Sequence, residues 1–153
     1  MNCDRHRLQT RMAFLAMSCL VVFASSGLLA ANPHSNTALE SVRPGREFRL
    51  KVGRQVTVKG TKVRIRFVAV ENDSRCPSDV TCVWAGNAAV RLQLGTGRGS
   101  KTVTLNTSKS PSFVGETEYH GYKVKLVELG PYPRSDRKIA PRDYTATLLV
   151  SKE

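Results

Sequence analysis

Few residues of this chain have the types and spacing that enzyme catalysis needs. A nucleophilic triad combines Ser or Cys with His and a carboxylate. Beyond the first thirty residues the only histidines are His34 and His120, and neither stands in a recognisable catalytic pattern. Glu116 and Glu118 would share one face of a strand and could form a carboxylate pair, but two such acids on an exposed strand are usually solvated. The sequence therefore predicts no catalytic residues and no enzyme activity, with a lone base at His120 as the remaining alternative.

Two cysteines, Cys76 and Cys82, enclose the short polar segment 77–81. Two thiols without a neighbouring histidine are too few for a zinc site, and redox-active pairs usually have two intervening residues beside a helix. In an oxidising compartment the two thiols pair, and closing this ring would stabilise the fold by roughly 2 kcal/mol. The sequence therefore predicts a structural disulfide, no metal site and no cofactor.

The compartment is indicated by the first 31 residues. Residues 1–11 contain three arginines against one aspartate, and residues 12–31 are uncharged and end in Ala30 and Ala31. This order is typical of a secretory signal peptide, so we predict cleavage near residue 31 and a periplasmic or extracellular protein. Cys3 and Cys19 would leave with the leader. A retained anchor is the alternative, because the uncharged run approaches the roughly 20 residues that span a bilayer.

No second apolar run of spanning length follows, so we predict a mature chain without a membrane span. Residues 32–45 are expected to form a flexible lead-in, and residues 46–153 a secreted β-domain.

The elements of that domain are predicted by apolar residues that alternate with polar ones, a period-two pattern typical of strands. The alternating segments are 48–52, 56–58, 63–67, 88–94, 103–105, 122–126 and 144–150. About seven short strands separated by Gly and Pro indicate an all-β fold, a single antiparallel β-sandwich or a small barrel. The loop at 130–141 could be functional, or it could be a crossover held down by Ile139.

One part of the chain resembles a known family. D-S-R-C-P at 73–77 is followed by C-x-W-x-G at 82–86 and an alternating strand. This pattern resembles a motif of a largely uncharacterised family of small exported bacterial β-domain proteins. The resemblance covers roughly residues 46–151. It implies a secreted β-domain and supplies neither an activity nor catalytic residues.

The residues of the motif also have a structural interpretation. Trp84 lies two positions beyond Cys82, so we expect it to pack against the bridge, and Arg75 could pair with Asp73 or Asp79. The alternative is that Arg75 and Trp84 contact a partner directly. The disulfide loop at 75–82 and the loop at 130–141 would then form a protein-interaction site or inhibit an extracellular enzyme.

Charge is concentrated near the start of the predicted domain. The chain has a formal net charge of +12, and between positions 43 and 66 nine basic residues face a single acid, Glu47. By alternation, five of these basic side chains point away from the apolar side of their strands. They are Arg49, Lys51, Lys62, Arg64 and Arg66. If their strands share a sheet, these residues form one basic outer face; otherwise the charge is the ordinary solvated surface of a basic protein.

A basic face outside the cytoplasm would attract an anionic envelope lipid or glycan. Nucleic acid is not an expected partner, because aromatic residues at base-stacking positions are scarce on that face. We therefore expect an exported, non-enzymatic β-domain that binds anionic cell-envelope material through this basic face. The alternative is a protein-interaction or enzyme-inhibitor module that uses the two loops.

Overall fold

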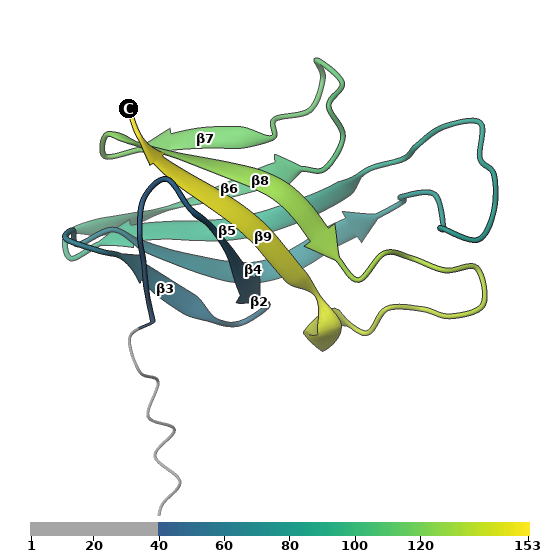
Figure 1. Cartoon of the computed structure of the whole chain (residues 1–153), viewed down its shortest axis with the longest axis horizontal. Coiled ribbons are helices and arrows are strands. Elements are labelled where there is room, and N and C mark those ends of the chain that lie inside the picture. Colours follow the sequence, from purple (N-terminus) through teal and green to yellow (C-terminus); the bar gives the residue numbers. More distant parts are fainter. Residues whose placement is uncertain (1–39) are drawn as a thin grey trace, which may run out of the picture. The chain divides into compact units, whose positions relative to one another are not determined.

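The computed structural model describes residues 40–153, which form two antiparallel-dominated β-sheets packed face to face (Figure 1). The prediction of an all-β domain is confirmed, and of the two alternatives the arrangement is a sandwich rather than a barrel. The predicted leader and most of the lead-in lie outside the described residues. Within residues 40–153 no helix has the length and apolar character needed to cross a membrane.

The first sheet contains five strands in the order β1-β3-β4-β5-β6. Their bounds are β1 Ser41–Val42, β3 Gln55–Val58, β4 Arg64–Asp73, β5 Ala88–Thr96 and β6 Gly99–Asn106. β1 pairs in parallel with β3, and the other neighbours are antiparallel. Val42 of β1 is buried in the core, so the described fold includes two residues of the segment that we assigned to the lead-in.

The second sheet contains four antiparallel strands in the order β2-β9-β8-β7. Their bounds are β2 Glu47–Lys51, β7 Glu116–Tyr119, β8 Tyr122–Gly130 and β9 Thr145–Lys152. β2 and β3 are consecutive in the chain but belong to different sheets, so the chain crosses from one sheet to the other at the turn containing Gly53. This crossing decides where the basic residues of the two strands lie.

Alternation along each strand builds the core between the two sheets. In β5 the residues from Ala88 to Leu94 alternate between buried and half-buried positions, as a strand with one face on a core requires. The largest fully buried side chains include Phe67, Ile65, Leu92 and Leu148, and they belong to one apolar cluster fed by both sheets. The hydrophobic pattern therefore fixes which side of each strand faces inward.

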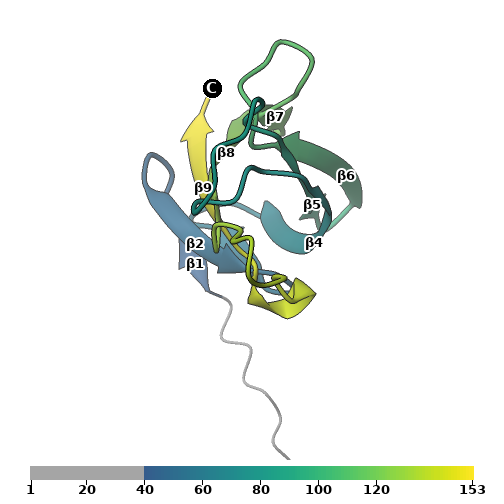
Figure 2. The ribbon, with the colours of Figure 1, turned by 90° about the vertical axis from the view of Figure 1, so that its right-hand side faces the viewer.

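Irregularities in two strands occur close to the end of the sandwich that carries the long loops. The register of β4 against β5 shifts twice between Phe67 and Asn72, and that of β8 against β9 shifts between Leu126 and Glu128. Such β-bulges bend a strand and redirect its side chains. The loops 74–87 and 131–144 follow these strands, and both lie in front of the sheets in Figure 2. The second loop ends in a single 3₁₀ turn, Pro141–Asp143.

The inward and outward assignment is tested by two adjacent residues of β4. Phe67 is fully buried and Arg66 is exposed. We expect Phe67→Ala to lower the free energy of unfolding by about 3–5 kcal/mol, because it leaves a cavity in the core. Arg66→Ala should change it by about 0.5 kcal/mol or less. Denaturant titration of both variants checks this, and equal effects would contradict the described orientation of β4.

Candidate functional site

The predicted disulfide between Cys76 and Cys82 is confirmed, and their Cα atoms lie 5.9 Å apart. It closes the tip of the loop 74–87. At the base of this loop, the backbone amide of Ser74 donates to the carbonyl of Asn87 at 2.8 Å, and that of Cys76 donates to Ala85 at 3.0 Å. The two arms of the loop are therefore held together at the sheet by hydrogen bonds and farther out by the disulfide.

Gly86 allows the two arms to approach each other this closely. Its φ of +71° lies in the left-handed region that favours glycine, and a Cβ at this position would overlap the backbone carbonyl of Ser74. The close approach of the two arms and the positive φ thus explain why the C-x-W-x-G motif has glycine at position 86.

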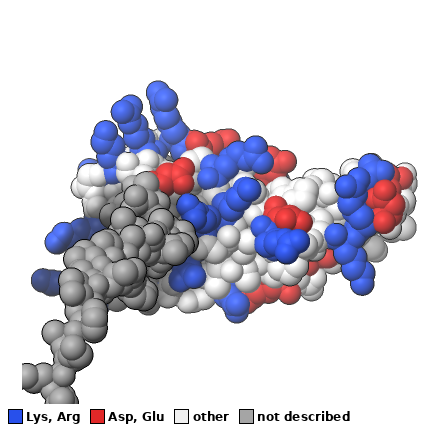
Figure 3. Space-filling model, turned by 90° about the horizontal axis from the view of Figure 1, so that it is seen from below, with Lys and Arg blue, Asp and Glu red and all other residues white. Residues whose placement is uncertain are grey.

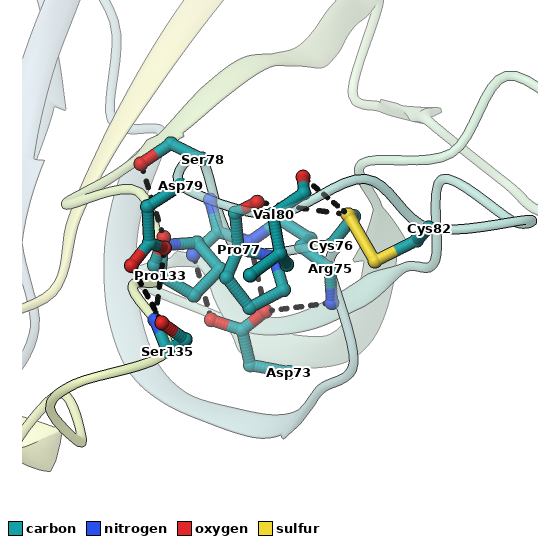
Figure 4. The surroundings of a disulfide bond; sticks show 10 residues. All are labelled: Asp73, Arg75, Cys76, Pro77, Ser78, Asp79, Val80, Cys82, Pro133 and Ser135. Atoms are coloured by element: carbon teal, nitrogen blue, oxygen red, sulfur yellow. Dashed lines mark hydrogen bonds and ion pairs between the residues drawn. A yellow bond between two sulfur atoms is a disulfide. The ribbon is translucent and has the colours of Figure 1, made fainter.

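A buried ion pair lies beneath the loop. The Nε and Nη2 atoms of Arg75 donate to the two carboxylate oxygens of Asp73 at 2.8 and 2.6 Å (Figure 4). The exposed fractions of the two side chains are only 5% for Arg75 and 9% for Asp73. A bidentate pair of this kind is the geometry in which arginine binds a carboxylate most strongly. Of the two partners that the sequence offered to Arg75, the structure selects Asp73.

Arg75 also reaches across to the loop 131–144. Its Nη1 donates to the carbonyl oxygen of Leu129, and its Nη2 donates to that of Pro131 at 3.0 Å. Its guanidinium carbon lies 5.1 Å from the centre of the Tyr132 ring, a cation–π distance. This burial contradicts the alternative that Arg75 contacts a partner directly, because its donors are used inside the protein.

Burial and hydrogen bonding change the acidity of the groups around this pair. Burial alone would raise the pKa of Asp73, but the hydrogen bonds and positive charge of Arg75 outweigh it and hold that pKa below 3.8. The Tyr144 hydroxyl donates to Asp73 at 3.0 Å. Burial, followed by this bond to the carboxylate, raises the pKa of Tyr144 to about 12.

A second set of hydrogen bonds joins the same two loops. Asp79 accepts from the backbone amide and the hydroxyl of Ser135 at 2.9 and 2.6 Å, and Ser78 donates its amide to Pro133 at 2.9 Å (Figure 4). The bonds from Ser135 lower the pKa of Asp79. The loops 74–87 and 131–144 therefore form one connected unit, which we name the loop end.

The tip of the loop end carries exposed apolar side chains. Val83 is 89% exposed and Trp84 is 81% exposed, so the predicted packing of Trp84 against the disulfide is wrong. That prediction applied strand alternation to a segment that is an irregular loop. Val80 in the same loop and Tyr132 in its neighbour are about half exposed. Trp84 therefore remains a candidate for direct contact with a partner.

The five predicted anion-binding residues do not share a face. Arg49 and Lys51 lie on β2 in the four-stranded sheet, whereas Arg64 and Arg66 lie on β4 in the five-stranded sheet, with Lys62 in the turn before β4. The outer sides of two packed sheets point in opposite directions. The condition that their strands share a sheet is therefore not met.

Acidic residues also interrupt the basic ones on the four-stranded sheet. Lys123 of β8 lies 3.4 Å from Glu116 and 3.9 Å from Glu118 of β7, and Glu47 and Glu128 lie on β2 and β8. In Figure 3 the basic side chains are likewise spread over the visible face with acidic ones among them. The net charge is thus distributed rather than gathered on one sheet.

The candidate catalytic residues lie apart from the loop end. Glu116 and Glu118 are on β7, where they face Lys123, and His120 occupies the turn after β7 with a φ of +51°. His34 lies outside the described residues. Among residues 40–153 no three His, Cys, Asp or Glu side chains converge as a metal site would require.

The sequence matches no protein-family model, and neither curated proteins nor solved structures show significant similarity to it.

The role of Gly86 can be tested against a glycine with the same backbone strain. Gly53 also has a positive φ, of +80°, but a Cβ there would meet nothing within 4 Å. Left-handed backbone costs an alanine about 1–2 kcal/mol at either position. We expect Gly86→Ala to lower the free energy of unfolding clearly more than Gly53→Ala, because only the former forces Ser74 to move. Equal losses in denaturant titrations would show that the loop arms are not in close contact.

The buried pair predicts a dependence of stability on pH. Since the pKa of folded Asp73 lies below its ordinary value of 3.8, its stabilising effect is complete above about pH 4 and is lost as the pH falls through the lowered pKa. We expect Asp73→Asn to cost about 3–5 kcal/mol at pH 7, because it leaves the Arg75 charge buried without its partner. This deficit should shrink as the pH is lowered below 4.

The matched control is Asp136→Asn, which changes an exposed aspartate in the loop 131–144. It should cost about 1 kcal/mol or less, as exposed ion pairs do. Equal costs for the two variants at pH 7, or a pH-independent deficit for Asp73→Asn, would contradict the account of the buried pair.

Proposed function

We propose that this chain is an exported, non-enzymatic binding module whose loop end holds a partner protein. The observation that carries the proposal is the exposure of Trp84 at the tip of a loop that is otherwise tightly anchored. Exposed tryptophan is rare on the surfaces of soluble proteins, and tryptophan is among the residue types most enriched at the energetic centres of protein interfaces.

Anchoring of the loops supports binding by them. The disulfide, the base hydrogen bonds and the Asp73–Arg75 pair restrict the loop end before a partner arrives. A site that is already ordered loses less conformational entropy on association, so more of the contact energy appears as affinity. Val83, next to Trp84 in the sequence, would add buried area beside the indole, and the half-exposed Tyr132 offers another apolar group on the second loop.

The charges of the loop end indicate the chemistry of the partner. The loop 131–144 has four basic residues against two acids, Asp136 and Asp143. Within the disulfide loop, the single cation Arg75 is buried and the acid Asp79 is bound to Ser135. A partner protein with an apolar pocket and an acidic rim would complement the exposed tryptophan and the basic residues of the loop 131–144.

Export is supported by the leader-like first 31 residues and by the disulfide, which persists in oxidising compartments. Binding rather than catalysis is supported by the Asp73–Arg75–Tyr144 cluster, whose polar atoms hydrogen-bond to one another and to backbone carbonyls. The five basic residues do not form one face, because β2 and β4 belong to different sheets. We therefore propose an anionic ligand only for the outer face of the five-stranded sheet.

The proposal is tested by placing a photoreactive amino acid at position 84 in the producing cell. We expect one discrete protein adduct from position 84 and none from position 127, where Val127 is an exposed apolar residue on β8, outside the loop end. With that partner purified, Trp84→Ala should weaken binding by about thirtyfold or more, as loss of an interface hot spot does.

Val127→Ala is the matched control and should leave the affinity nearly unchanged. Because Trp84 is the only tryptophan of the chain, its fluorescence should also shift to shorter wavelength when the partner covers it. Adducts of equal yield from both positions, or an unchanged affinity for Trp84→Ala, would refute the proposal.

A further inference from the structure

A hollow of about 340 Å³ lies on the outer face of the five-stranded sheet, beside the β5–β6 hairpin. Gly95 of β5 lies at the hollow, paired with Arg64 of β4 on one side and with Ser100 of β6 on the other. A glycine on the outer side of a sheet leaves open the space that a side chain would fill. The missing side chain at Gly95 therefore contributes to the hollow, which Thr96 and Gly99 of the hairpin also line.

The side chains that line the hollow are polar and carry positive charge. Arg64, Gln55, Gln93 and Ser100 supply guanidinium, amide and hydroxyl groups, and no described acidic residue is among the lining residues. Arg64 donates from Nη2 to the carbonyl of Thr96 at 3.3 Å, which places its guanidinium beside the hairpin.

Two further features of β4 concern the charge on this face. Arg66 lies two residues from Arg64 on the same side of β4, where it faces Gln55 of β3 and Gln93 of β5. Glu71, an acid of the same strand, is engaged by Arg91 at 3.0 Å and by the Thr104 hydroxyl at 3.1 Å. An anion in the hollow would therefore meet donors without a competing carboxylate.

We propose that this hollow binds an acidic polysaccharide by seating one sugar carboxylate against Arg64. The amides of Gln55 and Gln93 and the hydroxyl of Ser100 would then bond to ring hydroxyls of that sugar. An open hollow on the outer face of a sheet lets a polymer continue past it on both sides. The proposal concerns a different surface from the loop end and does not depend on the partner proposed there.

The probe is polygalacturonate, with neutral dextran and inorganic phosphate as comparisons, measured by calorimetry on the oxidised protein at low ionic strength. We expect binding to polygalacturonate, none to dextran, and weaker binding as salt is added. Arg64→Gln should lower the affinity by about tenfold, the loss typical of a charge-assisted contact. Arg49→Gln is the matched control, because it removes the same charge from the outer side of the other sheet.

A second variant separates shape from charge. A Cβ at Gly95 would meet its nearest neighbours at 3.6 Å, an ordinary contact distance, so Gly95→Thr should fold. It leaves the net charge unchanged but fills the floor of the hollow, and we expect it to abolish the binding. Thermal unfolding of all variants verifies that they are folded.

Three results would overturn the proposal. Equal losses in Arg64→Gln and Arg49→Gln would mean that only net charge matters. Unchanged binding by folded Gly95→Thr would place the ligand elsewhere. Complete displacement of polygalacturonate by an equal concentration of phosphate groups would identify a site for free oxyanions instead of a sugar acid.

Discussion

A guanidinium group removed from water needs an acceptor for its donors, and Arg75 finds its acceptors in three different segments. Asp73 at the end of β4 takes two of the bonds, and the carbonyls of Leu129 and Pro131 take the others. Opening either loop would separate some of these partners and leave a buried charge incompletely bonded, which is costly. The geometry of the loop end follows from this one group.

The other contacts of the loop end extend this arrangement outward. The bonds of Asp79 to Ser135 join the two loops a second time, and the disulfide closes the ring from Cys76 to Cys82. Close approach at Gly86 draws the two arms together. The loop end thus runs from a buried, hydrogen-bonded base to an exposed tip, where Val83 and Trp84 lack cover from the described residues. A surface of this kind presents apolar groups without needing to reorganise when a partner binds.

The sequence predicted the features that depend on neighbouring residues. Alternation located seven of the nine described strands, and the cysteine spacing located the disulfide. Strand β7 was missed, because its sequence E-T-E-Y has no alternating apolar residues. Strand β1 was not predicted, because two residues are too short for a periodic signal. Alternation also indicates which side of its own strand a residue occupies, but not which sheet the strand joins. Arg49 and Arg64 therefore appeared to share a face, although β2 and β4 belong to different sheets.

The burial of Arg75 could not be predicted from the sequence for a related reason. Its pairing with Asp73 was one of two local options, but its carbonyl acceptors lie 54 and 56 residues farther along the chain. Tyr144, which completes the cluster, is 71 residues from Asp73. No local pattern encodes contacts at that separation. For Trp84, the alternation rule was applied to an irregular loop, where successive side chains need not point to opposite sides.

The central claim is that Arg75 holds both loops in place beneath an exposed tip. Amide hydrogen exchange of Cys76, Ser78 and Ser135, compared between the wild-type chain and Arg75→Ala, tests it most directly. These amides donate to Ala85, Pro133 and Asp79. The account predicts clear protection of all three in the wild type and its joint loss in Arg75→Ala, while core amides such as Leu92 in β5 stay protected. Rapid exchange in the wild type, or protection unchanged in Arg75→Ala, would contradict it.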